Sequence, residues 1–289
     1  INFVSKFKKA NFISIIIFVL SIILISFKGL NYGIDFKGGT LIELRTETSV
    51  DTSIIRESLK SMNLGDINVK KFGKENDYLI KVEITKTNDP SFIKTIKDQL
   101  SSDLNSVINF RRVENIGPKV SSELLKSGFL AICLALASML IYIWVRFEWQ
   151  FSLAAIIAII HDVLITVGIF SFLSLEINLS IVAAVLTIVG YSMNDTVVIY
   201  DRIRENLNKY TKLNISELSN LSINETLSRT IITSLTTLLA LLSIFIMGGE
   251  ILRGFSFAMI LGVLIGTYSS IFVATPVLKF FKVSYKTLE

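Results

Sequence analysis

The run Tyr191-Ser-Met-Asn-Asp195-Thr-Val-Val-Ile-Tyr200-Asp-Arg-Ile-Arg-Glu205 decides the fold class of this chain. It closes an apolar stretch, residues 178–201, that is long enough to cross a bilayer, since a membrane helix needs about 20 predominantly apolar residues. The run nevertheless places a carboxylate, Asp195, inside that stretch. Because an ionised side chain in the bilayer costs about 2.5–3.5 kcal/mol on insertion scales, such a residue indicates an ion or proton site.

Five further apolar stretches of membrane-spanning length accompany this one. They cover roughly residues 11–29, 127–146, 151–174, 229–248 and 252–281. The mean hydropathy of +0.60 and the 18% of charged residues agree with them, because soluble domains carry more charge. The sequence therefore predicts a polytopic α-helical membrane protein with six transmembrane helices.

The composition excludes several classes of function. The net charge of +5 does not indicate nucleic acid, because the basic residues cluster just outside the apolar stretches, as membrane orientation requires. The single Cys133 and the single His161 allow neither an internal disulfide nor a common zinc site. We expect no metal, no cofactor and no enzyme activity, because no phosphate-binding loop and no nucleophile–base set is present.

The distribution of lysine and arginine predicts that both termini are cytoplasmic. Lys6, Lys8 and Lys9 precede the first stretch, which lacks a small-x-small cleavage site and is expected to remain as an anchor. The other basic positions on this side are Arg146, Arg202, Arg204, Lys209, Lys212, Arg229, Lys279, Lys282 and Lys286.

The predicted organisation has three parts. Residues 1–31 form the N-terminus and first helix, residues 32–125 an extracytoplasmic domain, and residues 126–289 the other five helices, with a cytoplasmic loop at 202–228. The middle part predicts strands at 39–48, 66–72, 78–85 and 107–113, with helices starting at Asp51 and at Asp89-Pro90, and a short amphipathic helix before the second span. This βαββαβ order predicts a small α+β domain of the ferredoxin-like type.

Three polar features interrupt the spans, and each has a functional and a structural interpretation. Asp195 is either an ion site or a structural hydrogen-bond acceptor near the headgroups. His161-Asp162 is either a proton relay or a polar clamp between helices. Arg229, followed on one face by Thr233, Thr236, Thr237 and Ala240, either pairs with Asp195 or reaches out to the membrane surface from a helix end.

Small residues recur every four positions in the last stretch. They are Gly254, Ala258, Gly262, Gly266, Ser270 and Ala274. Such a ridge lets another helix approach closely, and it favours helix packing over a surface on which helices slide during transport.

Several collinear motifs together resemble the SecF family, the smaller membrane subunits of SecD–SecF protein-translocation complexes in the resistance-nodulation-division superfamily. The motifs are Gly33-Ile-Asp-Phe-Lys-Gly-Gly39, His161-Asp-Val163, Asn194-Asp-Thr-Val-Val198 with Asp201-Arg-Ile-Arg-Glu205, Arg229-Thr-Ile-Ile-Thr-Ser234 and Gly248-Gly-Glu-Ile-Leu-Arg-Gly-Phe255. The resemblance covers nearly the whole chain, including a single ectodomain. SecD is similar but has a much larger ectodomain.

The resemblance implies a partner, a location and a proton path. A SecF-like chain pairs with SecD in the bacterial inner membrane and works with the SecYEG channel, using the proton gradient to draw unfolded polypeptide outward. In that family the aspartate matched by Asp195 and the arginine matched by Arg229 belong to the proton path, and Thr233 is expected to line it. Two other classes are open: a proton-driven exporter of drugs or lipids in the same superfamily, and a scaffold of the translocon that transports nothing.

Overall fold

The computed structural model describes residues 1–289 except 63, 72, 84–89, 211 and 285–289. It divides into two compact units, which are described one at a time. The membrane unit comprises Ile1–Asn31, Leu130–Leu175 and Ser180–Glu289, and the α+β unit comprises Tyr32–Phe129 and Glu176–Leu179.

Among the described residues, six helices are long and apolar enough to cross a membrane, so the chain is a multi-pass membrane protein as predicted. The first and the last of these spans each combine more than one element. The elements are η1 (Val4–Lys6), α1 (Phe7–Phe27), α5 (Pro118–Arg146), α6 (Trp149–Phe172), α7 (Leu179–Lys209), α8 (Ile215–Met247), α9 (Gly249–Ser269), η2 (Ser270–Ala274) and α10 (Thr275–Phe280).

Two boundaries differ from the prediction. The short amphipathic segment expected before the second span is helical but is not a distinct element, because α5 runs without a break from Pro118 into the apolar stretch. Most of the expected loop 202–228 is helical as well. Arg202 pairs with Glu205 of α7 (2.6 Å) and with Glu225 of α8 (2.7 Å), and these contacts extend both helices past their apolar parts.

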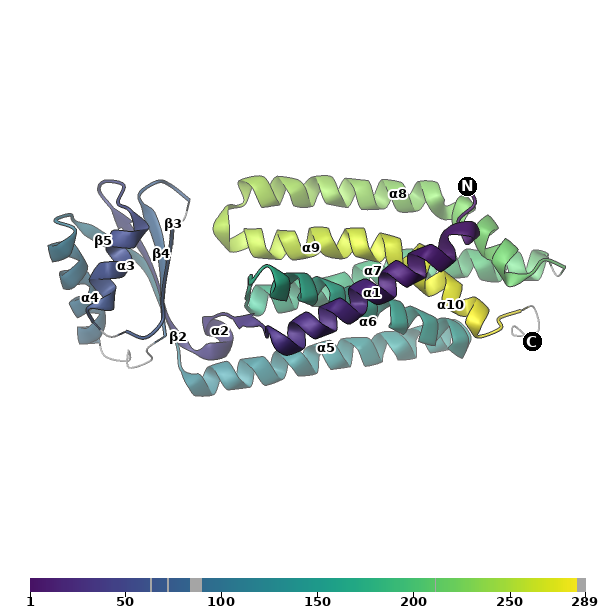
Figure 1. Ribbon diagram of the computed structural model, residues 1–289, viewed down its shortest axis with the longest axis horizontal. Coiled ribbons are helices and arrows are strands. Elements are labelled where there is room, and N and C mark those ends of the chain that lie inside the picture. The colour runs from purple at the N-terminus through teal and green to yellow at the C-terminus, as the bar shows by residue number, and fades with distance from the viewer. Residues whose placement is uncertain (63, 72, 84–89, 211, 285–289) are drawn as a thin grey trace. The chain divides into compact units, whose positions relative to one another are not determined.

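Burial is unequal among the helices of the membrane unit. The most apolar part of α6 is 67% buried, against 11% for α5 and 17% for each of α1 and α8. The buried side chains of α6 and α7 meet at Phe151 and Tyr200, whose rings lie 5.1 Å apart in an edge-on contact. In Figure 1, α8 runs alongside α9. The centre of this unit is therefore built by α6, α7 and α9.

The last predicted span, 252–281, is not one regular α-helix. Between α9 and α10 lies η2, a π-helical turn. The hydroxyl of Thr275, the first residue of α10, donates to the carbonyl of Ser270 at the start of this turn (2.8 Å). Single π-turns inside α-helices are frequent at functional sites.

The α+β unit contains a four-stranded antiparallel sheet. Its order is β3-β4-β2-β5, and β2 lies between β4 and β5. The elements are β1 (Asn31–Tyr32), α2 (Ile34–Lys37), β2 (Gly39–Thr46), α3 (Thr52–Lys60), β3 (Ile67–Lys71), β4 (Asp77–Val82), α4 (Pro90–Asp103), β5 (Ile108–Ile116) and β6 (Glu176–Ile177). From β2 to β5 the order is the predicted βαββαβ.

Local signals account for these elements. Asp51 caps α3, its carboxylate accepting a hydrogen bond from the Ser53 amide (2.8 Å) as the sequence predicts. Pro90 is the first residue of α4, where a helix tolerates proline, whereas Asp89 of the same predicted start lies outside the described residues. Apolar side chains on alternate positions of β2, such as Ile42 and Leu44, are fully buried against the two helices.

One ion pair crosses the sheet between neighbouring strands. Arg45 of β2 lies opposite Asp77 of β4 and donates two hydrogen bonds to its carboxylate (2.5 and 2.6 Å). Arg111 adds a longer contact of 3.7 Å. Hydrogen bonding to Arg45 lowers the pKa of Asp77 below its ordinary value.

The segment Glu176–Leu179 is part of the α+β unit and bonds to residues near its beginning and to β4. The Gly33 amide donates to the carbonyl of Ile177 (2.8 Å), and the Asp35 carboxylate accepts from the Leu179 amide (2.8 Å). Lys81 of β4 also pairs with Glu176. A side chain at Gly33 would meet the carboxylate end of Glu176, which would have to shift.

Candidate functional site

Asp195 lies inside the membrane unit and not at its surface. Its position on α7 leaves it only 2% exposed. Its Oδ2 accepts hydrogen bonds from Ser234 of α8 (3.5 Å) and Thr267 of α9 (3.4 Å), and these two hydroxyls are 2.7 Å apart. Both bonds to the carboxylate are long, so the two hydroxyls hold it weakly.

Arg229 does not pair with Asp195 in the described structure. Helix α8 begins at Ile215, so Arg229 lies in its interior and not at the start expected for the fifth span, and its side chain is exposed. Ser234, which reaches Asp195, lies five residues further on, about 7.5 Å along the axis at 1.5 Å per residue.

The Thr233 hydroxyl bonds to the backbone of its own helix and not to Asp195. Thr233 is half-buried, and its hydroxyl donates to the backbone carbonyls of Arg229 and Thr230 (both 3.0 Å). Ser234 is buried, and it is the one of these two neighbours that bonds to Asp195. In the expected stripe, Thr237 is half-buried and Thr236 and Ala240 are exposed.

Sequence reasoning missed Ser234 and Thr267 as partners of Asp195. A signal was present, because Ser234 closes the arginine motif and Thr267 is a hydroxyl residue within an apolar stretch. Two further hydroxyls nearby are buried with no partner in the described part of the chain: Tyr191, one turn before Asp195, and Thr230, one turn before Ser234. Both hydroxyls therefore retain an unused capacity for hydrogen bonding.

His161 and Asp162 form a second cluster, on the α6 side of α7. Asp162 is fully buried, and its Oδ2 accepts short hydrogen bonds from Ser192 of α7 and Ser269 of α9 (both 2.6 Å). Its Oδ1 lies 2.8 Å from His161 Nδ1. The His161 ring stacks on Phe18 of α1, and its Nε2 has no partner among the described residues. This cluster joins four helices.

The small-residue ridge of α9 and η2 lies against α7. A side chain at Gly262 would come within 2.2 Å of Ile188, and one at Gly266 within 3.1 Å of Ser192. Gly254 faces Ile181, while Ala258, Ser270 and Ala274 are fully buried. The close approach at Gly266 brings α9 near Ser192, which bonds to Asp162.

The two clusters share helices but differ in how tightly they hold a carboxylate. Helix α7 supplies Ser192 to one and Asp195 to the other, and α9 supplies Ser269 and Thr267. No group of three metal-binding side chains occurs among the residues that the structure describes. The arrangement suits uptake and release of a proton at Asp195.

Comparison of the sequence with known families gives two matches. Residues 96–284 match the model described as "Protein export membrane protein SecD/SecF, C-terminal", and residues 23–50 match the SecD/SecF GG motif. The protein translocase subunit SecF of Rickettsia rickettsii is 45% identical over 289 residues, covering 98% of this chain and 94% of the relative. That of Cereibacter sphaeroides is 46% identical over 255 residues, covering 85% and 78%.

Solved structures agree with these matches. A crystal structure of SecDF from Thermus, described as a translocon-associated membrane protein, superposes with a TM-score of 0.87 at 36% identity over 98% of this chain. SecDF in a super-membrane-facing form gives a TM-score of 0.73 at 35% identity. This chain spans 38% and 39% of the length of those two SecDF chains.

Proposed function

Since this chain belongs to the SecD/SecF family of protein-export membrane proteins, as a protein translocase subunit of the SecF type, we propose that it couples proton flow to the export of unfolded polypeptide. Its partners in this work are SecD and the SecYEG channel, in the inner membrane of a bacterium with both chain termini in the cytoplasm. The names of the relatives support protein translocation over export of drugs or lipids. This chain spans only 38% of the SecDF chain, which supports a separate SecD subunit that supplies the remaining part of the complex.

The observation that carries the proposal is the weakly held, buried carboxylate of Asp195 between three helices. When ionised, Asp195 draws the hydroxyls of Ser234 and Thr267 toward its Oδ2. When protonated, it loses that attraction and becomes a donor itself. Gain or loss of one proton therefore changes the force that holds α8 and α9 against α7.

Arg229 completes the cycle in this proposal. It shares α8 with Ser234, and a shift or rotation of α8 would bring its guanidinium toward Asp195 or take it away. A cation nearby favours the ionised carboxylate and so drives release of the proton. Buried Thr230, next to Arg229, and Tyr191, near Asp195, offer hydroxyls along which water could carry that proton.

The available energy is sufficient to bias such a movement. One elementary charge crossing a membrane potential of 100 mV is worth about 2.3 kcal/mol. Because about 1.4 kcal/mol corresponds to a tenfold change, one proton would shift a two-state equilibrium of the helices about fiftyfold.

The test is export of a secretory precursor into inverted membrane vesicles, with and without a proton gradient. Asp195→Asn keeps the shape of the side chain but cannot release a proton. We expect the variant to lose the gradient-dependent part of export while the gradient-independent part and the level of the assembled complex stay unchanged.

Asp201→Asn is the matched control. Asp201 lies on the same helix six residues later, is exposed, and pairs with Arg146 (3.0 Å) outside the site. Gradient-dependent export should survive this substitution. If Asp195→Asn exports like the wild type at equal complex levels, the scaffold interpretation replaces the proton-coupling one.

A further inference from the structure

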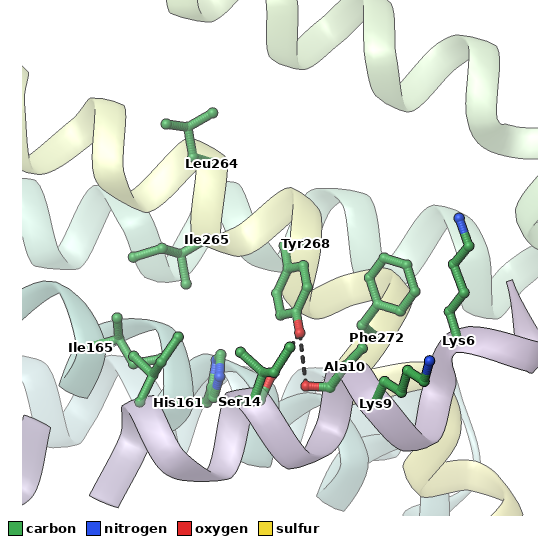
Figure 2. A pocket seen from close by; sticks show the side chains of 12 residues that line it. Lys6, Lys9, Ala10, Ser14, His161, Ile165, Leu264, Ile265, Tyr268 and Phe272 are labelled. Carbon is green, nitrogen blue, oxygen red and sulfur yellow. Dashed lines mark hydrogen bonds between the residues drawn. The ribbon is translucent and has the colours of Figure 1, made fainter. Parts of the chain in front are cut away.

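A groove of about 600 Å³ lies within the membrane unit between α1, α6 and α9. Figure 2 shows its residues, with Lys6 and Lys9 at one end and His161 and Ile165 toward the other. Its volume falls in the range of about 300–1,000 Å³ that is typical of ligand sites. None of the residues assigned to the Asp195 site lines this groove.

The walls of the groove are apolar along its length. Ile13 and Ile17 of α1 line the groove together with Leu264 and Ile265 of α9. Phe272 of η2 lies near the lysine end. From Lys6 to Ile17 the chain advances about 17 Å at 1.5 Å per residue, roughly half of the hydrocarbon core of a bilayer. A flexible hydrocarbon chain within one leaflet fits this length and lining.

The lysine end of the groove is positively charged and uncompensated. Lys6 and Lys9 are exposed, and no ion pair in the described part of the chain involves either of them. Beside them, the Tyr268 hydroxyl donates to the carbonyl of Ala10 (2.9 Å) and lies 2.9 Å from the hydroxyl of Ser14. Basic pockets between membrane helices attract anionic lipid headgroups.

From these observations we propose that the groove binds an anionic phospholipid. One acyl chain lies between α1 and α9, and the phosphate lies at Lys6 and Lys9. The lipid then covers the side of the bundle where His161 lines the groove. His161 is 5% exposed, and its Nε2 has no partner in the part of the chain that the structure describes.

Charge complementarity favours a lipid over a helix of a partner protein. Membrane helices carry their own lysine and arginine at the cytoplasmic end. A partner helix seated in the groove would bring such residues up to Lys6 and Lys9 and be repelled by them. The two lysines therefore attract an anionic headgroup, whereas they repel the basic end of a membrane helix.

Binding is tested on the full-length chain in its native complex, purified in a neutral detergent. Phosphatidylglycerol is titrated in, phosphatidylcholine with the same acyl chains serves as the zwitterionic comparison, and bound lipid is measured by native mass spectrometry. A lysine near a membrane surface contributes about 1 kcal/mol toward anionic lipid, so Lys9→Gln should weaken phosphatidylglycerol binding about fivefold. Lys6→Gln combined with Lys9→Gln should abolish the preference over phosphatidylcholine.

Lys8→Gln is the matched control. Lys8 lies on the same turn of α1 with the same charge but does not line the groove, so binding should stay as in the wild type. Equal losses for Lys8→Gln and Lys9→Gln would overturn the proposal, because they would indicate a diffuse charge effect. Competition by inorganic phosphate alone at equal concentration would also overturn it, because the site would then recognise a free anion.

Photo-crosslinking locates the lipid. Phosphatidylglycerol with a photoreactive acyl chain should label residues 10–17 and 264–272 more than the phosphatidylcholine analogue does, and Lys9→Gln should remove that excess. The exposed face of α5 around Phe129 and Leu130 provides the reference for ordinary lipid contact. The proposal would be refuted if the ratio of phosphatidylglycerol to phosphatidylcholine labelling were the same in the groove and on α5. A cross-link from the groove to another protein would also refute it. Export by Asp195→Asn is a separate measurement, so failure here leaves proton coupling untouched.

Discussion

At the scale of single residues, the two buried carboxylates of the membrane unit differ in how they are held. Asp162 has three partners at 2.6–2.8 Å, whereas Asp195 has two at 3.4 and 3.5 Å. Short hydrogen bonds to an ionised group are the strong ones, and they weaken steeply with distance. Asp162 is therefore suited to clamping helices together, and Asp195 to changing its partners.

Replacing Ser234 by alanine tests which hydroxyl serves Asp195. A typical hydrogen bond contributes about 1 kcal/mol and this one is long at 3.5 Å, so Ser234→Ala should change the proton-concentration dependence of gradient-driven export by less than about fivefold. Thr233→Ala is the neighbouring control and should behave like the wild type, because its hydroxyl bonds to the backbone. If Thr233→Ala changed this dependence more than Ser234→Ala did, Thr233 would line the proton path, as expected from the sequence. The measurement is export into vesicles at several internal pH values.

At the scale of elements, the side chains at a contact set how two elements pack in each unit. On α9, Gly262 and Gly266 have no side chains to keep α7 away, so backbone and hydroxyls of the two helices meet. In the sheet, β2 and β4 are joined where Arg45 faces Asp77. Asp77 is only 4% exposed, so this strand pair depends on a compensated charge.

The Arg45–Asp77 pair predicts loss of stability in acid. The pKa of Asp77 is lower in the folded state, so the stabilisation is complete above the ordinary pKa of about 4 and declines as the pH falls toward the folded value. Hydrogen exchange of the β2 and β4 amides, corrected for intrinsic rates, should therefore rise from pH 6 to pH 3.

Two variants complete this experiment. Asp77→Asn should remove most of the acid-dependent rise in exchange and weaken the strand pair at neutral pH. Asp98→Asn, at an exposed position of α4, should retain the wild-type profile. A wild-type profile that is flat down to pH 3 would mean that the pair adds nothing to the stability of the sheet.

At the scale of the whole molecule, half of the membrane helices carry large apolar surfaces with little cover from the chain itself. The buried share of the apolar stretch is 11% for α5 and 17% for α1 and α8, against 50% or more for α6, α7 and α9. Lipid can cover such surfaces, and so can a partner subunit. The SecF-type assignment makes SecD the proposed occupant of part of them.

Withholding that partner should shorten the lifetime of the chain. Without a partner, the apolar faces of α1, α5 and α8 remain open to misassembly and proteolysis, so the half-life in a pulse–chase experiment should fall several-fold in cells that lack SecD. Restoring SecD should restore the half-life. Equal half-lives in both strains would indicate that lipid alone covers these faces.

The six spans, the order of the α+β elements and the presence of a carboxylate within the fourth span could be predicted from the amino-acid sequence alone. These features depend on local properties: about 20 apolar residues for a span, alternation for the strands around Ile42, a capping side chain at Asp51, and a proline where α4 begins. Each is set by residues close together in the chain and is therefore visible without coordinates.

Which side chains meet became visible only when the helices were packed together. The tertiary structure placed Ser234 and Thr267, and not Thr233 or Arg229, on the carboxylate of Asp195, and it closed the Asp162 cluster with Ser192 and Ser269. The lysine-ended groove was likewise invisible in the sequence, because its walls come from three helices. These contacts depend on the rotation and axial shift of each helix, and a rotation of one residue, about 100°, exchanges Thr233 for Ser234.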